Sequence, residues 1–346
     1  MTAAEATNSR VEELWFTRCP VPTATGLAYK LGWLEQAFAP DGITLRTLQD
    51  ADPALGRHHY DHALPTLIRE GGSMLAIGAR AQGADTRLIG LTWIDEWQTI
   101  LVRPDSNIRG PADLAGKRLA LPAWTEHAIP SHQRGCSIAR GMSLHGYKGA
   151  LQAAGLGFDD VSFVEVPGQR GGTGRRGVGN LWAGIDLLRD GRVDAVYVKG
   201  ASAVEAARQA ELVVGIDLDQ VVERRQRVNN GTPRPITVHA HLLANHFELV
   251  VRFLHQTLRA AEWARHDLEG VRAILRDETS AHAGGVERAY RGDFHQTLHP
   301  TLDRERIELF RAQKSFLLTH GFLDADFDLD AWIDPRPLAV AHERLC

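Results

Sequence analysis

The stretch from Leu14 to Phe38 most constrains the fold, because it places a short apolar run directly before an amphipathic segment. Leu14 to Phe16 predicts a buried strand. Apolar residues then recur at the spacing of one helix face, at Leu27, Leu31, Leu34 and Phe38. Thr23 or Thr25 is the expected N-cap of this helix. A strand that runs into a helix is the opening unit of an α/β fold.

Cys19 lies in the turn between this strand and this helix. Open α/β sheets bind ligands at the carboxyl ends of their strands, and a helix N-terminus favours an anion. The same field raises the thiolate fraction of a nearby cysteine, which favours a reactive thiol. A buried structural cysteine is the alternative, and position alone leaves both interpretations open.

The totals restrict the class of protein. A chain of 346 residues is long enough for two domains, and a net charge of −4 without a dense basic stripe argues against a nucleic-acid partner. The three cysteines, at positions 19, 136 and 346, form no CxxC and fit a reducing compartment. The N-terminus lacks the pattern of a signal peptide, and no long apolar window predicts a membrane span. We expect a cytoplasmic monomer that contacts neither nucleic acid nor membrane.

Strands and helices alternate along most of the chain, which predicts mixed or parallel sheets flanked by helices. Leu64 to Ile68 predicts a short helix that ends at Gly71, Ser73 to Ala79 a strand, and Ile236 to Leu242 another strand. Crossovers near 105 and 235 divide the chain into a first lobe of 1–105 and 236–346 and a second lobe of 106–235. We expect the ligand cleft between the lobes.

Arg69 precedes two glycines and a serine, at the expected end of a helix. A solvated arginine that complements the helix dipole is the simpler interpretation. The functional one is an anion site, in which the guanidinium holds a two-oxygen acid and nearby N–H groups complete the contact. The N–H groups in question belong to Gly71, Gly72 and Ser73.

Two further groups of residues are weighed in the same way. The glycine-rich segment 168–179 contains a literal GxGxxG, but no strand ends directly before it, so we expect a lid over the cleft instead of a nucleotide loop. Its basic side chains are candidates for capturing an anion: Arg170, Arg175 and Arg176. His239 and His241 alternate on the expected strand and share a face that either looks into the cleft or caps the sheet edge. The cluster of His58, His59 and His62 lacks a metal-ligand spacing, so no metal is expected there.

Taken together, several motifs resemble those of the 2′-hydroxybiphenyl-2-sulfinate desulfinase family. The resemblance begins with Cys19-Pro-Val-Pro after a strand, then His59, then Arg69 followed by Gly71-Gly72. It extends through five further stretches: Asp113 to Arg118, Gly191 to Tyr197, Trp263 to Arg265, Asp293 to Gln296 and Gln313 to Thr319. It therefore covers most of the chain.

The resemblance implies a two-lobed type II periplasmic binding protein-like fold and a hydrolase that converts an aryl sulfinate into an arene and sulfite without a cofactor. It implies that Cys19 is the essential thiol, as nucleophile or proton donor, that His59 is its histidine, and that Arg69 and Gly72 hold the sulfinate. The segments Trp124 to His127 and Gln133 to Tyr147 depart from the family's aryl pocket. The aryl group therefore stays open, and a non-enzymatic binding protein for a small sulfonate, sulfinate or carboxylate is the alternative function.

Overall fold

The computed structural model describes residues 10–19, 21–167, 183–279 and 283–345. A five-stranded sheet has the order β2-β1-β3-β10-β4. Its strands are β1 (Glu13–Thr17), β2 (Thr44–Thr47), β3 (Leu67–Glu70), β4 (Thr86–Thr92) and β10 (Arg234–His239). β1, β2 and β3 run parallel, whereas β10 runs antiparallel to both β3 and β4. The carboxyl ends of β1 and β3 therefore meet the first residues of β10 at one edge.

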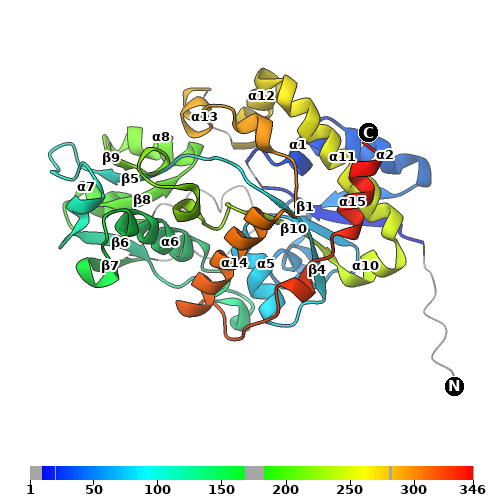
Figure 1. Ribbon diagram of the computed structural model, residues 1–346, viewed down its shortest axis with the longest axis horizontal. Coiled ribbons are helices and arrows are strands. Elements are labelled where there is room, and N and C mark those ends of the chain that lie inside the picture. The colour runs from blue at the N-terminus through cyan, green and yellow to red at the C-terminus, as the bar shows by residue number, and fades with distance from the viewer. Residues whose placement is uncertain (1–9, 20, 168–182, 280–282, 346) are drawn as a thin grey trace.

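The remaining strands form a second group, in the left half of Figure 1, while β1, β4 and β10 lie in the right half. They are β5 (Gln98–Val102), β6 (Arg118–Pro122), β7 (Ser162–Val166), β8 (Val196–Lys199) and β9 (Val213–Asp217). β5 pairs antiparallel with both β8 and β9, and β6 pairs parallel with β7. The sheets are thus mixed, as predicted from the sequence.

Helices cover both groups of strands (Figure 1). Their bounds are α1 (Ala24–Lys30), α2 (Trp33–Phe38), α3 (Pro53–Gly56), α4 (His58–Asp61), α5 (Ser73–Ala81), α6 (Ile138–Ala153), α7 (Ile185–Arg189), α8 (Ala201–Gln209), α9 (Leu218–Val221), α10 (Ala240–Asn245), α11 (Phe247–His266), α12 (Leu268–Thr279), α13 (Ala283–Ala289), α14 (Arg304–Thr319) and α15 (Arg336–Glu343). Among the described residues, no helix is both long and apolar enough to cross a membrane.

The core behind the first strand is built from the apolar faces predicted from the sequence. α11 packs against α1 and α15, and the Phe16 ring lies 5.9 Å from that of Phe253 between centroids. Thr23 caps α1, since its hydroxyl accepts a hydrogen bond from the Gly26 N–H at 3.0 Å. Gly32, with φ of 74°, separates α1 from α2, so the predicted single helix is two. This packing fixes the turn that carries Cys19.

Three local predictions are wrong for a shared reason. Leu67–Glu70 is strand β3 instead of a helix end, Ser73–Ala81 is helix α5 instead of a strand, and the chain turns from β10 into α10 at Ala240. Short apolar runs have no periodicity that separates a buried strand from a buried helix, so non-local pairing decides between them. Here β3 is buried between β1 and β10, which makes it a strand.

Candidate active site

Arg69 is the most unusual side chain at this sheet edge. It lies on β3 with 1% of its surface exposed. None of its three guanidinium nitrogens has a hydrogen-bond partner within the described part of the chain. Burial lowers its pKa to about 10, although the nearby Cys19 acts in the opposite direction. The group is still charged at neutral pH, and a buried cation without a partner is costly unless an anion joins it.

The two glycines after Arg69 make room for its side chain and for a neighbouring loop. A Cβ at Gly71 would lie 2.7 Å from Nη2 and 2.8 Å from Cζ of Arg69. A Cβ at Gly72 would lie 2.6 Å from the amide oxygen of Asn230. A side chain at either position would therefore displace the Arg69 guanidinium or the Asn230 amide.

Of the three backbone N–H groups predicted to bind an anion beside Arg69, two already donate to backbone carbonyls and one does not. The Gly71 N–H donates to the Pro235 carbonyl at 3.3 Å, and the Ser73 N–H donates to the Asn230 carbonyl at 2.5 Å. The Gly72 N–H donates to no acceptor among the described residues. The prediction that Gly71 and Ser73 offer free donors is wrong, because these donors hold the loop from β10 in place. Only Gly72 keeps a donor for a ligand beside Arg69.

Cys19 reaches the same edge through the register of the sheet. β1 pairs with β3 so that Thr17 stands opposite Arg69, and Cys19 follows two residues later. The thiol is free and partly exposed, just before α1. The structure therefore brings Cys19 and Arg69 together from strands that are neighbours in space, although 50 residues separate them in the sequence.

His59 lies in the short helix α4. Although the residue is partly exposed, its Nδ1 is buried and has no partner in the described ranges. Burial and then the nearby Arg69 lower its pKa to about 3, so the ring is neutral at pH 7. Its two neighbours are engaged: His58 Nδ1 lies 2.7 Å from the Asp61 carboxylate, and His62 Nε2 donates to the His59 carbonyl at 3.1 Å. His59 is the histidine of this cluster that is left for chemistry.

The remaining predicted site residues lie elsewhere. Arg170, Arg175, Arg176 and the expected lid 168–179 fall outside the described residues. His239 and His241 do not share a strand face, because His239 caps α10 by accepting from the His241 N–H at 3.2 Å. β10 is antiparallel to β3, so they lie at the opposite end of the sheet from Cys19. The structure therefore does not bring these two histidines to the edge that carries Cys19 and Arg69.

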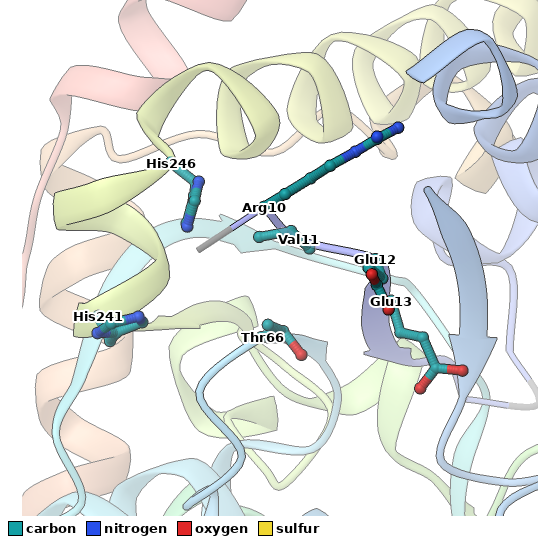
Figure 2. Close-up of a pocket in the computed structure, with 7 residues that line it drawn as sticks. All are labelled: Arg10, Val11, Glu12, Glu13, Thr66, His241 and His246. Atoms are coloured by element: carbon teal, nitrogen blue, oxygen red, sulfur yellow. The ribbon is translucent and has the colours of Figure 1, made fainter. Parts of the chain in front are cut away.

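His241 instead lines a separate surface pocket of about 340 Å³ at the start of β1. Figure 2 shows it there with His246, Val11 and Thr66. Val11 and Thr66 precede β1 and β3, whereas Cys19 and Gly72 follow those strands. The length of the sheet therefore separates this pocket from the thiol.

Sequence analysis missed two buried cationic side chains, of which Arg234 is close enough to Arg69 to lower the pKa of that guanidinium. Arg234 opens β10 and is 5% exposed, and Lys199 ends β8 and is also 5% exposed. A third missed group, Cys136, is buried close enough to Arg69 to interact with it electrostatically, and burial raises its pKa to about 12. A signal for Arg234 existed in its place between two prolines at the crossover, but only the pairing of β10 with β3 connects it to Arg69.

The fold and this edge define a class: a two-part α/β protein of the periplasmic binding protein type, with a buried, unpartnered arginine and a free thiol where the strands end. The periplasmic aliphatic sulphonate binding protein SsuA from Escherichia coli has the same fold, with a TM-score of 0.66 at 17% identity over 94% of this chain and 92% of that one. The predicted fold class is confirmed. No family model matches the chain.

Within this class the chain is similar to a particular enzyme along nearly its whole length. It is 29% identical to the 2′-hydroxybiphenyl-2-sulfinate desulfinase of Rhodococcus erythropolis, over 94% of this chain and 92% of the relative. The crystal structure of the desulfurization enzyme DSZB superposes with a TM-score of 0.70, at 27% identity over 96% of this chain and 99% of that one. The resemblance predicted from the sequence is confirmed.

Proposed function

We propose that this chain is a desulfinase, a hydrolase that cleaves the carbon–sulfur bond of an aryl sulfinate and releases sulfite. The observation that carries the proposal is the buried, unpartnered guanidinium of Arg69 beside the free thiol of Cys19. A cysteine-to-serine mutant of DSZB has been crystallised with biphenyl-2-sulfinic acid, and this chain matches that structure with a TM-score of 0.69, at 26% identity over 96% of this chain and 99% of that one. Similarity of this extent supports the same kind of reaction here.

In the proposed reaction, Arg69 and the Gly72 N–H bind the two sulfinate oxygens. A planar guanidinium suits a two-oxygen anion, and the bound anion supplies the charge partner that Arg69 lacks. The carbon keeps the electron pair of the carbon–sulfur bond and gains a proton, while the oxygen of water bonds to sulfur and gives up a proton. Reactants and products balance without an oxidant, a reductant or a metal.

Cys19 has two possible roles in this step. It protonates the ring carbon, or it attacks sulfur and forms an intermediate that water then clears. His59 serves either role as a neutral hydrogen-bond partner, because burial and Arg69 disfavour its charged form. The aryl group of the natural substrate stays open.

The alternative function is binding without turnover. The SsuA-type neighbours are 17% identical or less, so they show the fold alone. One experiment separates the two functions: incubation of the protein with a panel of aryl and alkyl sulfinates, followed by measurement of released sulfite. A desulfinase releases sulfite from at least one aryl sulfinate, whereas a binding protein releases none from any.

Substitution of the thiol tests its role in the same assay. We expect Cys19→Ser to bind sulfinate and to lose turnover by at least about 100-fold, because a hydroxyl is a far poorer nucleophile and acid near neutral pH. Full activity of Cys19→Ser removes this cysteine from the mechanism.

A further inference from the structure

A second buried arginine lies beside Arg69 and is also left with unmatched charge. Arg234 is 5% exposed, and its Nε has no hydrogen-bond partner in the part of the chain that is described. Because β10 is antiparallel to β3, Arg234 stands where β3 ends, next to the Pro235 carbonyl that accepts from the Gly71 N–H. The two guanidinium groups are close enough that Arg234 lowers the pKa of Arg69.

Lys199 brings a third cation to the same place from the other group of strands. Its Nζ lies 3.2 Å from the Glu96 carboxylate, and Tyr290 also donates to that carboxylate at 2.9 Å. A Cβ at Gly231 would lie 2.9 Å from Lys199 Nζ and 2.8 Å from Arg234 Nη2. The charged ends of Lys199 and Arg234 therefore converge on the backbone of one glycine.

Within the described residues, the buried carboxylates nearby form no direct ion pair with either arginine. Glu96 is engaged by Lys199 and Tyr290. Glu70 accepts from the Thr92 hydroxyl at 3.1 Å and from the Thr25 N–H at 3.3 Å, and burial raises its pKa although the nearby Arg234 acts in the opposite direction. Two like charges buried side by side repel each other, and an anion with several oxygens between them removes that repulsion.

We propose that Arg234, supported by Lys199, is the second cationic arm of the site and binds the sulfur oxygens on the side away from Arg69 as sulfite forms. This inference rests on the proposed desulfinase function. The substrate has two oxygens on sulfur, whereas the product has three, and hydrogen sulfite gives up a further proton near neutral pH. A second cation therefore stabilises the product-like state more than the substrate, which is the condition for accelerating the reaction.

The test compares Arg234→Gln with the wild type in three readouts: kcat and KM for an aryl sulfinate, and the inhibition constant of sodium sulfite. We expect kcat to fall at least about tenfold and sulfite inhibition to weaken by a similar factor, with a smaller change in KM. Arg234→Lys keeps the charge and recovers part of the loss. The matched control is Arg225→Gln, an exposed arginine of the same crossover that pairs with Glu223, and it behaves as the wild type.

Two outcomes overturn the inference. The first is an Arg234→Gln protein with unchanged kcat and unchanged sulfite inhibition. The second is a lower kcat with unchanged sulfite inhibition, because that pattern describes a purely structural residue. Calorimetric titration of sulfite into the protein needs no turnover and separates this inference from the proposed function. If the wild type binds sulfite in a way that depends on Arg234 but hydrolyses no sulfinate, the proposed desulfinase function is wrong and the inference of an anion site at Arg234 stands. If the wild type binds no sulfite, the inference of the anion site is wrong.

Discussion

At the scale of single residues, Arg69 destabilises the free folded protein and serves the proposed function. A charged group buried without a partner destabilises the folded state, so its removal relieves a cost of about 1–3 kcal/mol. We expect Arg69→Met to abolish sulfite release and to leave the free protein as stable as the wild type or more stable, by urea denaturation. Arg304→Met, an exposed control on α14, changes the free energy of unfolding by less than about 0.5 kcal/mol. A large loss of stability in Arg69→Met contradicts the picture of an unpartnered charge.

His59 makes a pH-dependent contribution whose sign follows from its lowered pKa. In the folded state this pKa is about 3, below the ordinary value of 6.5. Between these two pH values His59 is therefore protonated in the unfolded chain and neutral in the folded chain. Stability is therefore lost as the pH falls from about 6.5 toward 3. We expect His59→Gln to lose stability less steeply over this range, by at most about 1.4 kcal/mol per pH unit.

Denaturation at several pH values between 4 and 7 measures this difference. His62 and His145 are also buried with lowered pKa values, so part of the slope persists in His59→Gln. Identical slopes in the wild type and His59→Gln show that the folded protein does not suppress protonation of His59.

At the scale of elements, the turn between β3 and α5 determines the position of the Arg69 guanidinium. Gly71 has no positive φ, so alanine there strains no backbone, but its Cβ meets Nη2 of Arg69 at 2.7 Å. We expect Gly71→Ala to displace the guanidinium and to lower kcat/KM by about 10- to 100-fold, with a small change in stability. Gly110→Ala is the matched control, because nothing lies within 4 Å of the added methyl. Equal activity of the two variants means that Arg69 does not need its present position.

The same element shows what the sequence can and cannot predict. β1, the capped start of α1 and the place of Cys19 were predictable because a cap and a helical period are local signals. The sequence predicted a helix where β3 lies and a strand where α5 lies, because the short apolar runs of these two elements carry no such local signal. Arg234 was missed because only the antiparallel pairing of β10 with β3, 165 positions apart between Arg69 and Arg234, makes it a neighbour.

At the scale of the whole molecule, the site connects the two groups of strands. Arg69 and Arg234 belong to the five-stranded sheet, whereas Lys199 belongs to the sheet of β8, β5 and β9. A bound anion that contacts both sheets stabilises the folded chain through its affinity, by about 2.7 kcal/mol at a concentration 100 times its Kd. Because Cys19→Ser is expected to bind without turnover, it allows this effect to be measured with an aryl sulfinate at equilibrium.

We expect the aryl sulfinate to raise the unfolding temperature of Cys19→Ser in differential scanning calorimetry, with the shift growing with ligand concentration. The double variant Cys19→Ser, Arg69→Met shows no shift, because the neutral side chain offers the anion no charge. Adding Lys199→Met to Cys19→Ser reduces the shift, since this variant removes the cation that we propose supports Arg234 and leaves Arg69 in place. An equal shift in the Arg69→Met double variant means that the sulfinate binds elsewhere, and that the buried guanidinium is not its partner.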